Sequence, residues 1–204
     1  MEQKSFLTRI RDRKVFAPQT RERGVALYEH FLGIVIRDFS GKNILNIGSG
    51  DTGLFEKAVA DIGAKVFTIS PHFSHEYSGK MRANYKHPNV FPIAAKVSRF
   101  SDNKDGLPIK NDSMDVATAL YSLPVHFPEI DLIDVASRFF KEILDLLKSD
   151  GKAIIYPIPE SKVYSYREIL SSIGAGNINF TEINEEENDV VYKGEKVFRL
   201  EIIK

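Results

Sequence analysis

Three glycines in the stretch NILNIGSGDTGLF, at residues 43–55, have the spacing of a loop that binds a nucleotide. Gly48, Gly50 and Gly53 follow a short apolar run and match the pattern G-x-G-x-x-G. Glycine lets backbone amides approach a ligand closely, and a helix beginning after the loop would present its positive N-terminus to that ligand. The pattern suits a dinucleotide, another nucleoside-type ligand or a tight structural turn, and the glycines alone do not distinguish the three.

Other side chains that could do chemistry are few. His126, in the segment YSLPVHF, is the preferred candidate for a general base, and a partly exposed loop histidine is the alternative. Tyr121 and Ser122 precede it and either line the same pocket or pack within a strand. The histidines and glutamate of PHFSHE, at 71–76, resemble metal ligands, but no second ligand pair follows, so we predict no metal site. The polar segment 74–87 is interpreted as a solvated helix face.

Apolar periodicity predicts the elements that must position these residues. Alternating strands and helices favour an α/β fold with a doubly wound, mostly parallel sheet and helices on both faces. The last two strands, joined by an acidic loop, predict an antiparallel pair beside the parallel strands. The expected strands are 43–47, 64–70, 90–95, 114–123, 152–158, 178–183 and 197–204, and the expected helices are 20–38, 54–63, 133–148 and 163–173.

In such a sheet, ligands bind at the carboxyl ends of the strands, and the glycine loop follows the first of them. With 204 residues, the chain is long enough for one core and short for two. We therefore predict one globular domain, in which residues 1–39 form an N-terminal helical extension or lid and residues 40–204 form the sheet domain.

Composition excludes several classes of protein. Twenty-eight basic and 28 acidic residues cancel, so the charge does not favour binding to nucleic acid or to an anionic membrane. The absence of cysteine excludes disulfides and cysteine nucleophiles, and fits a reducing compartment. No apolar run is long enough for a signal peptide or a membrane span, so we predict a cytoplasmic protein.

Two downstream segments, GLPIKNDSMDVATALYSL and FFKEILDLLKSDGKAIIYPIP, resemble class I S-adenosylmethionine-dependent methyltransferases when taken together with the glycine loop. The resemblance is to the small-molecule branch and covers about residues 40–204. It implies a Rossmann-like seven-stranded sheet and methyl transfer from S-adenosylmethionine to a small-molecule acceptor, leaving S-adenosylhomocysteine. The residues that carry it are Leu107, Pro108, Met114, Asp115 and Val116 in the first segment, and Leu146, Leu147, Lys148, Gly151 and Lys152 in the second.

The resemblance also implies where the cofactor would bind. Carried over residue by residue, the cofactor-binding positions are Asn46, Gly48, Ser49, Gly50, Ser70, Pro71, Lys96 and Tyr121. The family usually has acids at the positions of Asn46 and Ser70 and one near Ala95. This substitution by neutral residues leaves a second hypothesis open, a non-catalytic methyltransferase-like binding protein that has lost cofactor affinity. A nicotinamide-dependent enzyme is a third, weakened because Ser70 stands where an acid would bind the ribose.

Overall fold

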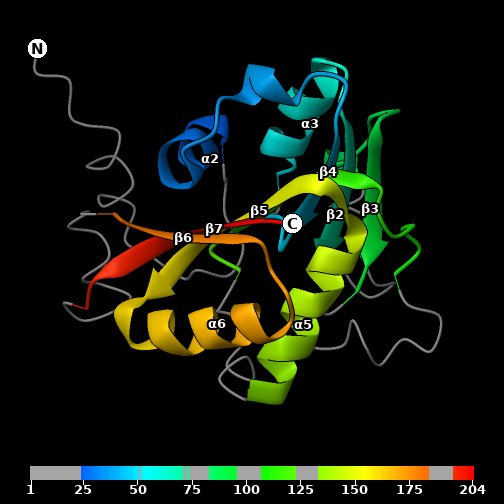
Figure 1. Ribbon diagram of the computed structural model, residues 1–204. Coiled ribbons are helices and arrows are strands. Elements are labelled where there is room, and N and C mark those ends of the chain that lie inside the picture. The colour runs from blue at the N-terminus through cyan, green and yellow to red at the C-terminus, as the bar shows by residue number, and fades with distance from the viewer. Residues whose placement is uncertain are drawn as a thin grey trace, which may run out of the picture.

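A seven-stranded sheet organises the chain (Figure 1). The computed structural model describes residues 24–50, 52–70, 73, 83–95, 107–122, 133–183 and 195–204. The strands are β1 (Asn43–Ile47), β2 (Lys65–Ser70), β3 (Val90–Ala94), β4 (Met114–Leu120), β5 (Leu147–Pro159), β6 (Asn177–Glu182) and β7 (Val197–Ile203). The helices are α2 (Val25–Leu32), the 3-10 helix η1 (Ile36–Phe39), α3 (Leu54–Asp61), α5 (Ile133–Leu146) and α6 (Glu160–Ser172).

The strands lie in the order β3-β2-β1-β4-β5-β7-β6. The first five pair in parallel, whereas β7 is antiparallel to both of its neighbours, β5 and β6. The predicted mostly parallel sheet with an antiparallel C-terminal pair is therefore confirmed. The sheet order reverses at β1, so the crevice beyond its carboxyl end, where β1 lies between β2 and β4, is the expected place for a ligand.

Helices cover both faces of the sheet, and each face has its own apolar core. Figure 1 shows α2 and α3 on one side and α5 and α6 on the other. The helix α5 contributes Phe139, Phe140 and Ile143 to one core, while α2 and α3 contribute Phe31 and Phe55 to the other. Alternate residues of a strand face opposite sides, which explains why Ile44 and Leu45 belong to different cores.

The N-terminal helix is shorter than predicted. Its periodicity predicts one helix over 20–38, but α2 ends at Leu32 and a separate 3-10 helix follows. Gly33 explains the break, because its φ of 60° is left-handed and ends the helix. The guanidinium group of Arg199 on β7 packs against Gly33, but it is the end of a flexible side chain, so the left-handed backbone is the main reason for glycine here.

The turn predicted before the fifth strand is a bulge inside β5. Met114 pairs with Leu147 and Val116 pairs with Lys152, so four residues on β5 lie opposite one on β4. Gly151 lets this bulge pack against β4, because a Cβ there would lie 3.0 Å from the carbonyl oxygen of Met114.

Among the described residues, no helix is long and apolar enough to cross a membrane.

Candidate functional site

The glycine loop lies at the carboxyl end of β1, packed against β4. Gly48 has a φ of 73°, and its N–H donates to the carbonyl oxygen of Ile69 on β2 at 2.9 Å. A Cβ added at Gly48 would overlap the Cβ of Ser122, the second residue after β4. Glycine at this position therefore permits both the left-handed turn and the close approach of β1 to the end of β4.

Two serine hydroxyls lie buried beside this contact. Ser49 is 7% exposed and Ser122 is 4% exposed, and neither Oγ has a partner within the part of the chain that the structure describes. A buried hydroxyl without a partner costs about 1–3 kcal/mol. Two such groups at the ligand edge of the sheet indicate a place for a polar ligand that supplies the missing hydrogen bonds.

Tyr85 contacts the other side of the glycine loop. Its hydroxyl donates to the carbonyl oxygen of Gly50, and its ring packs edge-on against Phe73 with the ring centroids 4.8 Å apart. Gly53, the N-cap residue before α3, has a left-handed φ of 62°, and a Cβ there would lie 3.2 Å from the Tyr85 ring. The interpretation of residues 74–87 as a solvated face is wrong for Tyr85, which is buried because its ring packs against the loop.

A row of polar side chains crosses the sheet two residues below the loop. Asn46 on β1 pairs in register with Thr68 on β2 and with Thr118 on β4. All three are fully buried, and the Thr118 hydroxyl donates to Asn46 Oδ1 at 3.0 Å. The row therefore joins the three strands whose carboxyl ends form the candidate site.

Glu56 and Tyr28 complete the hydrogen bonds of this row from the helix side. Glu56, in the first turn of α3, is 2% exposed and accepts from Asn46 Nδ2 at 2.7 Å and from the Thr68 hydroxyl at 3.2 Å. The Tyr28 hydroxyl, on α2, lies 3.0 Å from Asn46 Nδ2 and 3.3 Å from its Oδ1. Asn46 thus uses both its amide donors and its oxygen inside the protein.

Sequence reasoning missed Glu56, although a signal for its burial was present. Val59 and Ala60 follow it by three and four residues, and both are buried. Residues at this spacing share one face of a helix, so Glu56 lies on the apolar face that packs against the sheet. An acid on such a face indicates a buried polar partner, here Asn46.

Ser70 and Tyr121 lie at the carboxyl ends of β2 and β4, the two strands that flank β1. Ser70 is the last residue of β2 and is buried. Tyr121 follows β4 with a φ of 51°, which is rare for an aromatic residue, and its ring packs edge-on against Phe31 and Tyr156 with the ring centroids 5.5 Å apart. Its N–H donates to the carbonyl oxygen of Tyr156 at 2.7 Å. The ring therefore belongs to the core beneath α2, and the backbone turn sets the position of Ser122.

Several predicted site residues lie outside the described residues. These are Pro71, Lys96 and His126. The structure therefore brings together Asn46, Gly48, Ser49 and Gly50 around the end of β1, with Ser70 and Tyr121 at the ends of the neighbouring strands. Within the described ranges, no group of three or more His, Asp or Glu side chains could hold a metal ion.

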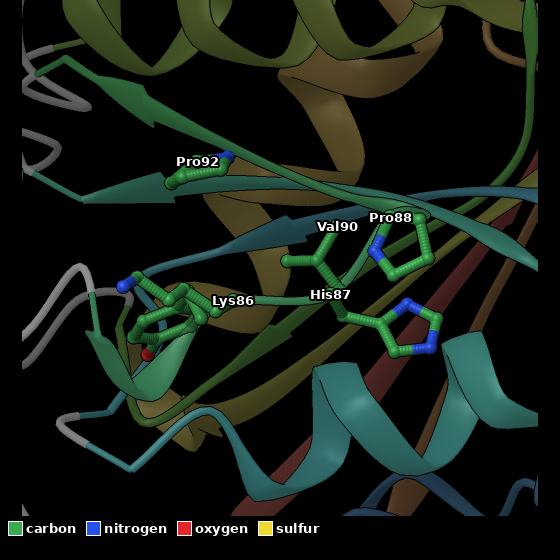
Figure 2. A pocket seen from close by; sticks show the side chains of 6 residues that line it. Lys86, His87, Pro88, Val90 and Pro92 are labelled. Atoms are coloured by element: carbon green, nitrogen blue, oxygen red, sulfur yellow. The ribbon is translucent and has the colours of Figure 1, made fainter.

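A pocket of about 550 Å³ extends from Tyr85, beside the glycine loop, to the amino end of β3 (Figure 2). It is lined by Tyr85, Lys86, His87, Pro88, Val90 and Pro92. His87 is engaged within the protein, because its Nε2 lies 3.3 Å from Asp61 Oδ1 and its Nδ1 accepts from the Asn89 N–H at 3.1 Å. The amino end of a strand is the wrong end for ligand binding in this kind of sheet, so we place the candidate site at the glycine loop instead.

Asp115, part of the first family-like segment, lies at the opposite end of the sheet from the glycine loop. Its carboxylate accepts from the Asn43 N–H at 2.7 Å and from Lys148 Nζ at 2.5 Å. Burial raises the pKa of Asp115, but the hydrogen bonds from Lys148 and Asn43 and the charges of Lys148 and Lys42 outweigh it and hold that pKa below its ordinary value. This part of the segment therefore anchors β1, β4 and β5 to one another.

Comparison with known proteins adds the class of fold. No family model and no curated protein matches the chain. Among solved structures, it is similar to a candidate O-methyltransferase from Nostoc punctiforme, with a TM-score of 0.55 and 16% identity over 80% of this chain and 52% of that one. It is also similar to an S-adenosylmethionine-dependent methyltransferase from Mesorhizobium loti, with a TM-score of 0.57 and 13% identity over 85% of this chain and 100% of that one.

A third similar structure contains a bound product. The phosphoethanolamine N-methyltransferase 2 of Haemonchus contortus, in complex with phosphomonomethylethanolamine and S-adenosylhomocysteine, matches with a TM-score of 0.52 and 14% identity over 81% of this chain and 49% of that one. The chain thus spans about half the length of the Nostoc and Haemonchus proteins. At these identities the likeness establishes the fold. The chain has the seven-stranded fold of the S-adenosylmethionine-dependent methyltransferases.

Proposed function

We propose that this protein binds S-adenosylmethionine and transfers its methyl group to a small-molecule acceptor. The observation that carries the proposal is the pair of buried hydroxyls of Ser49 and Ser122, which have no partner among the described residues and lie beside Gly48 where β1 meets β4. The fold supports it, because solved methyltransferases share this sheet and one of them holds S-adenosylhomocysteine.

The residues at the ends of β1 and β4 fit the polar end of the cofactor. Its amino acid moiety carries an ammonium and a carboxylate, which hydroxyls and loop amides can bind. The backbone of Gly48 to Gly50 and the hydroxyls of Ser49 and Ser122 would hold this end. Ser70, Pro71 and Lys96 would lie toward the adenosine end, and Tyr121 would act through the backbone turn that it forms.

The chain's own part in the reaction is to bind, to align and to exclude water. When bound, S-adenosylmethionine supplies an electrophilic methyl group, so no protein nucleophile is required. The acceptor atom has to be held in line with that methyl group. His126 is the proposed general base for an acceptor that must lose a proton. The segment 1–39 is proposed as a helical extension or lid, and its helix α2 packs into the core.

Titration calorimetry with S-adenosylhomocysteine tests the site directly. We expect binding to the wild-type protein and a several-fold loss of affinity in Ser122→Ala. Because the Ser122 hydroxyl has no partner among the described residues, the substitution should leave the melting temperature unchanged or raise it. Ser172→Ala is the matched control, since its hydroxyl bonds Ile169 within α6 and should not affect affinity. No heat of binding at millimolar ligand would contradict the proposal.

One observation favours a second candidate, a non-catalytic binding protein with this fold. The last residue of β2 is the neutral Ser70, so that strand end offers no carboxylate to the ribose hydroxyls. A hydrogen bond to a charged group contributes about 1.5–3 kcal/mol, against about 1 kcal/mol for a neutral one. Transfer of a labelled methyl group to any small-molecule acceptor would exclude this candidate.

A further inference from the structure

Glu56 is a buried acid that the proposed methyl transfer does not use, and it bridges the two ends of the glycine loop. Asn46 lies two residues before Gly48, and Glu56 lies three residues after Gly53. Their hydrogen bond of 2.7 Å therefore closes the loop at its base, joining β1 to the first turn of α3. A carboxylate that accepts two hydrogen bonds at a helix N-terminus is in a favourable place despite its burial.

The same pair is fixed to the neighbouring strands. Thr68 donates to Glu56 at 3.2 Å from β2, and Thr118 donates to Asn46 at 3.0 Å from β4. Both of these contacts involve Asn46 or Glu56. A change in the side chain of Asn46 or Glu56 would therefore disturb contacts that join β1, β2, β4 and α3.

We infer that Asn46 and Glu56 form one positioning unit, in which a single buried carboxylate sets the conformation of the glycine loop and can be carried by either residue. The chemistry of the contacts supports the exchange. An aspartate at 46 would still accept from Thr118, and a glutamine at 56 would donate to that aspartate in the reverse sense of the present bond. Two carboxylates at 2.7 Å in a fully buried site would repel each other strongly.

A double-mutant cycle tests the exchange without any ligand. We expect Asn46→Asp to lower the melting temperature by on the order of 10 °C, because it places a second charge against Glu56. Glu56→Gln should lower it by less, because an amide can still bond to Asn46 or Thr68 after a flip. The double variant N46D/E56Q should recover most of the loss caused by N46D alone. A double variant no more stable than N46D would overturn the exchange.

The NMR amide signals of Gly48 and Gly50 test the positioning role, because a general loss of stability would not shift them in the folded protein. In the ligand-free protein at low temperature, Glu56→Gln should shift the NMR amide signals of Gly48 and Gly50, and the double variant should return them toward their wild-type positions. Thr181→Val, on β6, is a control that should leave both signals unchanged. Unshifted glycine signals in a folded Glu56→Gln protein would overturn the positioning role.

The consequence for binding rests on the proposed function. If the unit sets the loop, the affinity for S-adenosylhomocysteine should fall several-fold in Glu56→Gln and recover in the double variant. Affinity that is equal in the folded wild-type and Glu56→Gln proteins would count against the positioning role. If the wild-type protein fails to bind this ligand, the proposed function fails, while the stability cycle and the glycine signals still decide the inference.

Discussion

At the scale of single residues, Gly48 satisfies two requirements that substitution can separate. Its left-handed φ of 73° disfavours any residue with a Cβ, and that Cβ would also overlap Ser122. Gly41 has nearly the same φ, 72°, but nothing lies within 4 Å of its hypothetical Cβ. The two glycines therefore share the backbone requirement, and only Gly48 has the steric one.

We expect Gly41→Ala to lower the free energy of unfolding by about 1–2 kcal/mol, the cost of a left-handed alanine. Gly48→Ala should lower it by a further ~1–3 kcal/mol, because Ser122 has to move in a packed site. Urea unfolding of both variants measures the difference. If both variants lose the same free energy of unfolding, Ser122 can move away at no cost and the contact between β1 and the end of β4 is not tightly packed.

At the scale of elements, Asp115 joins three strands at the end of the sheet away from the site. It accepts from the backbone of β1 and from Lys148, which lies in the bulge of β5. The bulge brings Lys148 opposite Asp115, and Gly151 allows the bulge to pack against β4. Asp115 therefore fixes β1 to β4 and β5 at the end of the sheet opposite the glycine loop.

We expect Asp115→Asn to lower the free energy of unfolding at pH 7 by about 1–2 kcal/mol, less than a fully buried charged pair because solvent reaches both side chains. The folded state lowers the pKa of Asp115, so its contribution is present above pH 4 and is lost as the pH falls through the folded-state value. The variant and wild type should therefore converge in acid. Asp150→Asn, an exposed acid of the same bulge, is the matched control for urea unfolding at pH 7 and pH 3.

At the scale of the whole molecule, Glu142 makes stability depend on pH near neutrality. Burial in α5 raises the pKa of Glu142, and the charge of Asp145 raises it further, from 4.5 to about 7. The folded protein then binds more protons than the unfolded chain between these values, so the free energy of unfolding falls as the pH rises through this window. Above about pH 7 the stabilising contribution of protonated Glu142 is lost.

We expect Glu142→Gln to be more stable than the wild type at pH 8, by about 1–2 kcal/mol after allowance for partial exposure, and nearly equal to it at pH 4.5. Thermal melts at half-unit steps of pH measure the growing difference. Glu168→Gln, which removes an exposed acid on α6, is the matched control. A stability difference between Glu142→Gln and the wild type that stays constant with pH would show that the pKa of Glu142 is not raised.

Local patterns in the sequence were sufficient for the elements and their order. The run NILNI predicts β1 with its observed bounds, because a buried strand needs only a short apolar run ended by glycine. The α/β alternation and the terminal strand pair predict the sheet for the same reason. The N-terminal helix was predicted too long because its apolar spacing continues past Gly33, where a left-handed glycine ends α2 and the side chain of Arg199 packs against it.

The sequence by itself determined the strand and helix pattern, the glycine loop and the expectation of a ligand at the end of β1, since these depend on residues close together in the chain. Only the tertiary structure decided which polar groups meet there. It pairs Asn46 with Glu56, ten residues away, and with Thr118, 72 residues away. It also brings Ser122 against Gly48. The physical reason is that strand register and helix packing set these contacts, and neither is encoded in the spacing of any one segment.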